Sequence, residues 1–224
     1  MCGRFALHSP RSRIASRYFN LQLPVGDVHA KYNITPGVQI TSVLATLDDP
    51  LSFDFSHWGF HPPWAKDDAP TPINIRAEKA AATSPYFRSA FAHRRCLIPA
   101  NGWYEWRRTG SGKQPYYITL RDPGEDEVVF FAGLWEPAGE GAETCCAIMT
   151  EPVSPALAFI HDRQPLVLDP ECRWQWLDPE LSDRETIRKV ARQLNPDRLM
   201  AYPVSTRVNR PANDDPGLTE EVGG

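Results

Sequence analysis

The chain has 224 residues, a formal net charge of −4 and 42% hydrophobic residues, including seven tryptophans. These values exclude a disordered segment, argue against a generic polyanion binder, and allow one large domain or two small ones. No apolar run reaches the ~18 residues of a membrane span, and arginines interrupt the N-terminal segment, so neither a membrane helix nor a signal peptide is predicted.

The N-terminal half begins with a predicted helix over residues 9–18, which a Ser-Pro pair opens. Two strands follow, over residues 39–47 and 51–58, and the Asp-Asp-Pro sequence between them predicts a hairpin turn. The second strand alternates apolar with polar residues, as expected of a strand buried on one face. Another Ser-Pro pair predicts a helix over residues 84–92.

The C-terminal half contains more strand signals than helix signals. Its β-branched and aromatic runs predict strands over residues 115–121, 128–134, 144–149, 166–168 and 200–204. Ser154-Pro155 predicts a short helix that ends near His161. Ser182 and Glu185 have the spacing of a capping box, and the helix that they begin is predicted to stop at Asn195-Pro196.

These elements predict a single α+β domain over residues 1–224, built on a curved, mainly antiparallel β-sheet or barrel with a few flanking helices. No repeat, low-complexity linker or break in composition marks a second domain. The tail after Asn213 is predicted to be frayed and flexible.

The five cysteines form no C-x-x-C pair, and the histidines do not cluster. Without an export signal, this pattern predicts free thiols in a reducing cytoplasm. It predicts no metal site, and no sequence feature requires a cofactor.

Cys2 is the first candidate for chemistry. Initiator methionine is usually removed when the next side chain is small, so Cys2 can become the mature N-terminus. Its amine titrates near ~8 and its thiol near ~8.5, so both are partly deprotonated at neutral pH. This pair suits an aldehyde, because the amine condenses to an imine and the thiol then closes a thiazolidine ring. The alternative is that Cys2 is simply a small residue after Met1.

Asn74 and Arg76 point to the same side of an extended segment, where the arginine offers a phosphate-binding fork. The alternative is a loop with a solvated arginine. Trp64 lies in a turn-rich stretch, where an exposed ring can stack on a base or wedge into a duplex. Packing into the core is the alternative for both nearby tryptophans, and it is the preferred interpretation for Trp58.

Glu105 and His161 are candidate acid–base groups. Glu105 stands between two aromatic residues of a strand, where it is either solvated or held in a desolvated pocket that raises its pKa toward neutrality. Trp106 lies on the opposite face if the strand is regular, whereas a bulge near Gly102 would change that. His161 would lie in the last turn of its helix, where the helix dipole favours the imidazolium. A structural histidine is the alternative.

Taken together, these segments resemble the SRAP family, the SOS-response-associated peptidase-like proteins that process abasic DNA. The matching motifs occur in family order and span roughly residues 2–215. They lie at residues 1–5, 32–36, 58–60, 64–66, 74–78, 95–106, 161–163 and 204–209.

The resemblance implies a monomeric, DNA-associated cytoplasmic protein that captures abasic sites in single-stranded DNA as a thiazolidine crosslink. It implies that Asn74 positions the N-terminus and the sugar, that Glu105 and His161 transfer protons, and that Glu105 assists removal of Met1. Peptidase-type and lyase activities are implied further. The expected catalytic residues are Cys2, Asn74, Glu105 and His161. The residues expected to contact DNA are Gly3, Arg4, Trp64, Arg76, Trp106, Thr150 and Arg163.

Three positions depart from the family pattern, but none is a proposed catalytic group. Gln164 stands where the family commonly has Met, Arg210 where a second Asn often follows, and Gly37 where a polar residue is usual. Two other functions stay open. One is a hydrolase in which the Cys2 thiol attacks an amide, and the other is a non-covalent reader of damaged DNA.

Overall fold

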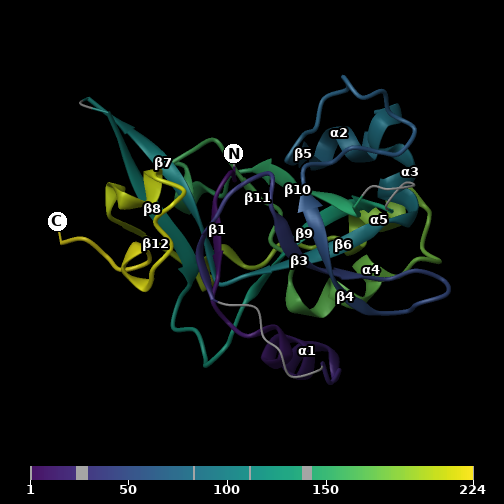
Figure 1. The fold of residues 1–224 in the computed structure, drawn as a ribbon, viewed down its shortest axis with the longest axis horizontal. Coiled ribbons are helices and arrows are strands. Elements are labelled where there is room, and N and C mark those ends of the chain that lie inside the picture. The colour runs from purple at the N-terminus through teal and green to yellow at the C-terminus, as the bar shows by residue number, and fades with distance from the viewer. Residues whose placement is uncertain (1, 24–29, 83, 111, 138–142, 224) are drawn as a thin grey trace.

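The strands form two sheets in the computed structural model, which describes residues 2–23, 30–82, 84–110, 112–137 and 143–223 (Figure 1). The five-stranded sheet consists, in spatial order, of β12 (Leu199–Pro203), β8 (Gly112–Leu120), β7 (Gly102–Thr109), β1 (Phe5–Leu7) and β2 (Lys31–Ile34). The larger sheet has the order β11 (Arg163–Pro165), β10 (Cys145–Pro152), β4 (Ser52–Trp58), β3 (Gln39–Leu44), β6 (Arg95–Ala100) and β9 (Val129–Glu136), and β5 (Asn74–Arg76) pairs with β10.

Most neighbouring strands are antiparallel, and the exceptions are the pairs of β10 with β4 and with β5. Because β10 also pairs with β9, the larger sheet curls back on itself. The predicted α+β class and the curved, mainly antiparallel sheet are therefore confirmed. The strands are divided between two sheets and are not gathered in one barrel.

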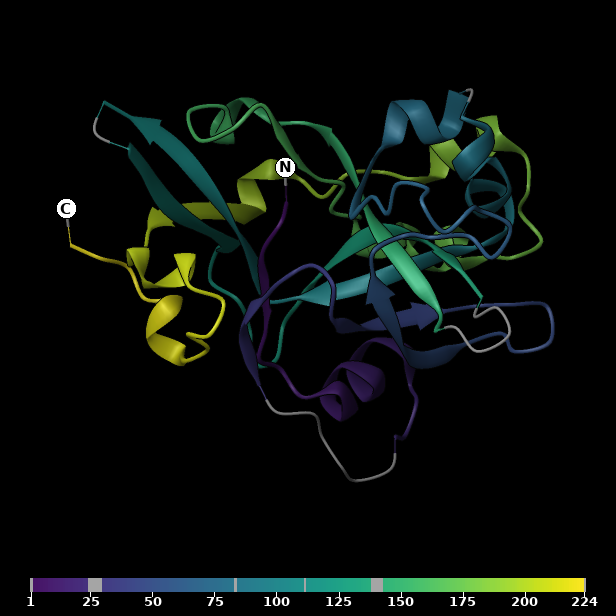
Figure 2. The same cartoon turned by 45° about the horizontal axis from the view of Figure 1, so that its top comes forward.

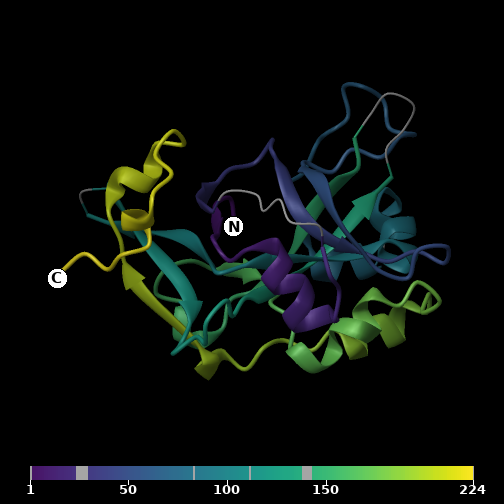
Figure 3. The ribbon, with the colours of Figure 1, turned by 60° about the horizontal axis from the view of Figure 1, so that its bottom comes forward.

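Short helices flank the larger sheet. They are α1 (Arg11–Phe19), α2 (Ala77–Ala82), α3 (Pro85–His93), α4 (Arg173–Leu177) and α5 (Arg184–Val190). Figure 3 shows α1 crossing this sheet, where Phe19 packs edge-on against Phe53 and Phe130 at centroid distances of 5.3 and 5.6 Å. In Figures 1 and 2 the N-terminus lies between the β7–β8 hairpin on one side and α2 and α3 on the other.

An aromatic cluster joins the two sheets. Phe5 of β1 packs edge-on against Trp58 at 5.2 Å and against Phe131 at 6.0 Å, and Trp103 of β7 meets Phe131 at 5.7 Å. All four side chains are at most 1% exposed. Trp58 therefore packs into the core, as the sequence predicts. Burial of rings such as these stabilises the fold by roughly 1.5–3 kcal/mol each, and it anchors the strand that directly follows Cys2.

Three helix predictions need correction. Residue Pro10 occupies the N-cap of α1, while Ser9 Oγ instead accepts a hydrogen bond from Asn101 at 2.8 Å. The helix predicted to reach His161 is only a short 3₁₀ turn, η1 (Pro155–Leu157). The cap of α5 is Asp183, not Ser182, since its carboxylate accepts the Thr186 N–H at 2.8 Å.

The segment after Asn213 is packed, contrary to the prediction of a frayed tail. The Asp214 carboxylate accepts the backbone N–H groups of Tyr32 and Asn33 at 2.6 and 3.1 Å. Leu218 is fully buried. Side-chain capping of an exposed strand end and one apolar anchor therefore hold this polar sequence in place. Within the described residues, no helix is both long and apolar enough to cross a bilayer.

Candidate active site

Cys2 is held at the start of β1 by Asn74 of β5. The Asn74 Nδ2 group donates a hydrogen bond to the Cys2 carbonyl oxygen at 2.6 Å. The parallel pairing of β5 with β10 fixes Asn74 in turn, opposite Ile148. Asn74 Oδ1 is buried and has no hydrogen-bond partner within the described part of the chain. The asparagine thus positions the N-terminal segment and keeps one acceptor for a further group. Met1 lies outside the described residues.

Glu105 lies on β7 in a desolvated position, which was one of the two alternatives for it. Its side chain is 4% exposed, and burial raises its pKa to about 7. The nearby charge of Asp162 adds to the rise. A carboxyl group with a pKa near neutrality exchanges protons readily at physiological pH, as a general acid or base requires.

The Cys2 thiol is completely buried, and this corrects the expectation that it is partly ionised at neutral pH. Burial raises the pKa of the thiol well above its ordinary value, and the charge of Glu105 raises it further. The thiol therefore keeps its proton until a base removes it. Glu105 is the carboxyl group whose charge acts on the Cys2 thiol.

His161 follows η1 and shares a small cavity with Glu105. The cavity has a volume of about 10 Å³, about the space of one water molecule. The Nδ1 atom of His161 accepts the backbone N–H of Arg163 at 3.0 Å and lies 2.8 Å from an Asp162 carboxylate oxygen. Burial lowers the pKa of His161, so the expected stabilisation of its imidazolium by a helix dipole is wrong.

Arg4 and Trp106 lie together on the other face of β7. The β7–β8 register is regular from Gly102 to Thr109, so no bulge turns Trp106 toward the face of Glu105. The Arg4 guanidinium lies 5.9 Å from the Trp106 ring centroid and donates to Asn33 Oδ1 and to the Val208 carbonyl oxygen, at 2.8 and 2.7 Å.

These contacts occupy part of the donor set of Arg4, and burial lowers its pKa. Trp106 Nε1 donates to Asn209 Oδ1 at 2.7 Å. Arg4 and Trp106 therefore form a preorganised pair, although Arg4 is not the freely available phosphate fork that the sequence predicts.

Arg163 and Thr150 are engaged inside the protein. The Arg163 guanidinium forms two hydrogen bonds to the Glu78 carboxylate, at 2.6 and 3.1 Å, and donates to the Thr150 carbonyl oxygen at 2.7 Å. Thr150 is 0% exposed and Arg163 is 9% exposed. Direct DNA contact by Thr150 does not fit this geometry, and Arg163 acts here as a brace between β10, β11 and α2.

Trp64, Arg76 and Gly3 remain accessible. Trp64 is 61% exposed and packs edge-on against Tyr86 of α3, with the ring centroids 5.4 Å apart. Arg76 is exposed at the end of β5, and Gly3 is half-buried next to Cys2. Trp64 thus contacts α3 through Tyr86, and Arg76 directly precedes α2. These two helices lie on the side of the N-terminus opposite the β7–β8 hairpin (Figure 2).

Sequence reasoning missed two supporting residues. Glu78 pairs with Arg163, and Asn33 accepts from Arg4. Both residues stand inside the polar motifs already noted, Glu78 four positions after Asn74, so the density of polar residues in these motifs was the available signal.

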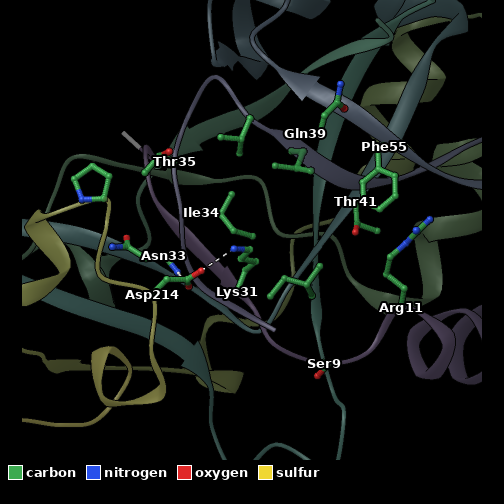
Figure 4. A pocket seen from close by; sticks show the side chains of 14 residues that line it. Ser9, Arg11, Lys31, Asn33, Ile34, Thr35, Gln39, Thr41, Phe55 and Asp214 are labelled. Carbon is green, nitrogen blue, oxygen red and sulfur yellow. Dashed lines mark hydrogen bonds and ion pairs between the residues drawn. The ribbon is translucent and has the colours of Figure 1, made fainter. Parts of the chain in front are cut away.

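A second cavity, of about 330 Å³, is separate from this site (Figure 4). It lies between β1, β2, β3 and the start of α1, and a Lys31–Asp214 ion pair of 3.0 Å crosses its wall. None of the described residues that line it is a predicted catalytic or DNA-binding residue. Across the described ranges, no group of three or more His, Cys, Asp or Glu side chains is placed to hold a metal ion.

Known proteins match this chain over nearly its whole length. The SOS response associated peptidase (SRAP) family model matches residues 1–211. The chain is 36% identical to the abasic site processing protein YoqW of Bacillus subtilis (strain 168), over 98% of this chain and 99% of that protein. It is 32% identical to the abasic site processing protein YedK of Escherichia coli (strain K12), over 99% and 100%. It is also 32% identical to the abasic site processing protein HMCES of Gallus gallus, over 96% of this chain and 76% of that protein.

Two crystal structures share the fold. A protein of Bacteroides thetaiotaomicron superposes with a TM-score of 0.79 at 22% identity, covering 99% of this chain and 100% of that one. A phage-related protein of Bordetella bronchiseptica superposes with a TM-score of 0.74 at 29% identity, covering 91% and 94%. The family match over most of the sequence, together with relatives above 30% identity along almost all of it, shows that this chain belongs to the SRAP family.

Proposed function

We propose that the protein recognises abasic sites in single-stranded DNA and captures them covalently through Cys2 once Met1 is removed. The observation that carries this proposal is the placement of Cys2 beside an amide and a carboxyl group of raised pKa, which lines a small cavity together with an imidazole. The named relatives are abasic site processing proteins. An abasic site is also the DNA lesion that exposes an aldehyde, the electrophile that suits an N-terminal cysteine.

The chemistry begins only after the Met1–Cys2 peptide bond is hydrolysed, because an amide nitrogen is not a nucleophile. The free amine of Cys2 then adds to the aldehyde carbon of the ring-opened deoxyribose. The imidazolium form of His161 donates the proton with which the hydroxyl leaves as water, and an imine remains. Finally the Cys2 sulfur adds to the imine carbon and its proton passes through Glu105 to the nitrogen. The net reaction releases one water and needs no oxidant or reductant.

Burial of the thiol sets the order of these steps. A thiol that keeps its proton leaves the amine as the first nucleophile. Glu105, with a pKa of about 7, is matched to removing the thiol proton at neutral pH. We propose the same carboxylate as the base for hydrolysis of Met1 and the acid–base group for any strand cleavage.

DNA would cross the N-terminus between the two flanking regions. Trp64 and Arg76 are next to α3 and α2 on one side, and Arg4 with Trp106 is next to β7 on the other. A missing base leaves a gap suited to aromatic packing, while the arginines hold the backbone. In this proposal the protein acts as a monomer on cytoplasmic DNA and shields the lesion from other reactions.

The test is a crosslinking assay with an abasic single-stranded oligonucleotide, read on a denaturing gel. Wild-type protein is expected to give a stable adduct, and Cys2→Ala to give none. Cys146→Ala is the matched control, because Cys146 is also a free cysteine that is 0% exposed. Equal crosslinking by Cys2→Ala would refute the proposal. Salt-sensitive binding without an adduct would favour the non-covalent reader, and turnover of a glutamine amide without an adduct would favour the hydrolase.

A further inference from the structure

An exposed aromatic residue next to the catalytic groups has no role in the proposed chemistry. Phe159 is 49% exposed although it is large and apolar. The Arg107 guanidinium lies 5.6 Å from its ring centroid, and the Tyr116 ring packs edge-on against it at 5.6 Å. We refer to Phe159, Arg107 and Tyr116 as the Phe159 cluster. Two neighbours thus fix the ring while half of its surface faces solvent.

The Phe159 cluster is adjacent to the catalytic residues both on the β7–β8 hairpin and in the segment that precedes His161. Tyr116 is the cross-strand partner of Glu105 in the β7–β8 ladder. Arg107 lies two residues beyond Glu105 on the same face of the strand, a separation of about 7 Å. Phe159 comes two residues before His161 in the chain. A nucleotide that follows a sugar bound at Glu105 and His161 would therefore reach this cluster.

The local charge favours a polyanion. Strands β7 and β8 carry three basic side chains, Arg107, Arg108 and Lys113. Their one acidic side chain is the buried Glu105. Within the described part of the chain, no carboxylate lies within ion-pair distance of Arg107 or Arg108. Burial is the main cause of the lowered pKa of His161; the charge of Asp162 opposes this shift, and the charge of Arg108 makes a smaller contribution in the same direction as burial.

We propose that the Phe159 cluster is a subsite for the nucleotide next to the abasic residue, in which Phe159 stacks on the base and Arg107 binds the phosphate. This inference rests on the proposed function. An aromatic face beside unpaired cations is the combination that binds single-stranded nucleic acid without sequence preference. The proposed subsite would bind the DNA on one flank of the lesion at the hairpin side of the site, whereas Trp64 and Arg76 would contact the DNA on the other flank.

The test measures binding to fluorescent oligonucleotides that carry a tetrahydrofuran abasic analogue, which has no aldehyde and cannot crosslink. Two oligonucleotides are used, one with nucleotides only 5′ and one with nucleotides only 3′ of the analogue. We expect Phe159→Ala to weaken binding of one of them about tenfold and to leave the other unchanged. Phe159→Tyr keeps the ring and is expected to bind as wild type. Arg107→Gln is expected to reduce the slope of log affinity against log salt by about 0.7 for the same oligonucleotide.

Two substitutions away from the site are the controls. Trp174→Ala removes an aromatic ring that is also 49% exposed, and Arg13→Gln removes an exposed cation of α1. The subsite would be overturned if Phe159→Ala bound both oligonucleotides with wild-type affinity, or if it lost the same affinity for both. It would also be overturned if Trp174→Ala lost as much affinity for the same oligonucleotide as Phe159→Ala. Failure of the proposed function looks different, because wild-type protein would then not crosslink the aldehyde form while Phe159→Ala still weakened binding to one analogue.

Discussion

At the scale of single residues, Glu105 links the stability of the fold to its chemistry. Burial raises the pKa of Glu105 from an ordinary 4.5 to about 7. A carboxyl group whose pKa rises on folding stabilises the folded state at low pH, and this contribution is lost as the pH rises through the folded value. We therefore expect the free energy of unfolding to fall between about pH 4.5 and 7, by about 3 kcal/mol from this residue.

Glu105→Gln should remove that part of the pH dependence, as measured by urea unfolding at several pH values. Some slope will remain, because burial also raises the pKa of Glu151 to about 7. Glu151→Gln is the matched comparison, since it is expected to change the slope without changing crosslinking. If Glu105→Gln unfolds with the full wild-type slope, Glu105 is not the desolvated acid described above.

The rate of crosslinking should follow the same titration in wild-type protein. In the proposed mechanism the carboxylate form of Glu105 removes the thiol proton, so the rate of stable adduct formation is expected to rise as the pH passes through about 7. Glu105→Gln is expected to slow the reaction about 10²-fold and to flatten this profile. Single-turnover crosslinking over a pH series checks this, and an unchanged profile in the variant would assign the base to another group.

Asn74 should affect the same rate through geometry and not through proton transfer. Asn74→Leu keeps the approximate side-chain size and adds no charge, but it removes the donor to the Cys2 carbonyl oxygen. We expect a loss of about 1–3 kcal/mol of stability and at least about tenfold slower crosslinking, with the pH profile kept. Urea unfolding and the crosslinking series measure both effects. A changed pH midpoint would instead indicate that Asn74 takes part in proton transfer.

At the scale of elements, β10 supports the site from both sides. It pairs with β5, which carries Asn74, and with β11, which begins two residues after His161. The Arg163 guanidinium ties these strands to α2 through Glu78. Arg163 therefore adds a side-chain link to the strand pairing that holds the amide and the imidazole.

Arg163→Met should lower stability by about 2 kcal/mol, less than a fully buried ion pair would give because Glu78 is partly exposed. Arg163→Lys should recover little of this, since it cannot form the two-pronged contact. Urea unfolding and binding to the abasic analogue are the two measurements. Normal stability with lost DNA binding would show that Arg163 contacts DNA directly, as the sequence alone predicts.

Local sequence signals predicted elements well where the signal and the packing agree. Strands β4 and β9 were predicted to within two residues at each end, because every side chain of the apolar run in β9 is buried. The alternation of β4 predicted the strand but not its buried face, since Phe53 and Phe55 are half-buried whereas Ser56 and Trp58 are buried. The helix expected to end at His161 was overestimated. Its Ser-Pro start is also compatible with a single 3₁₀ turn. After that turn, the packing of Leu157 and Ile160 around the cavity at Glu105 outweighs the local helix signal.

At the scale of the whole molecule, the C-terminal segment closes the smaller sheet. Asp214 caps the backbone of β2, and Leu218 packs with Tyr104 and Val208 in a separate small core. Removal of residues 214–224 should therefore cost at least about 2 kcal/mol of stability, of which burial of Leu218 is the main part. Thermal and urea unfolding of the truncated chain measure this. Wild-type stability of the truncated chain would support the frayed tail that composition predicts.

Motifs in the sequence were enough to select the candidate site residues, but they did not show which of these residues are accessible. Cys2, Asn74, Glu105 and His161 stand in dense polar or aromatic segments, and the fold brings them together. Thr150 and Arg163 stand in similar segments but are buried. Only the three-dimensional neighbours decide whether an arginine reaches a phosphate or a carboxylate of its own chain.

The most direct test of the proposed capture is intact-mass measurement of purified protein before and after mixing with an abasic oligonucleotide. The proposed mechanism predicts a starting chain without Met1 and a product with the mass of protein plus oligonucleotide minus one water. Peptide mapping should place the added mass on Cys2. A chain that retains Met1 and yet crosslinks, or an adduct on any other residue, would contradict it.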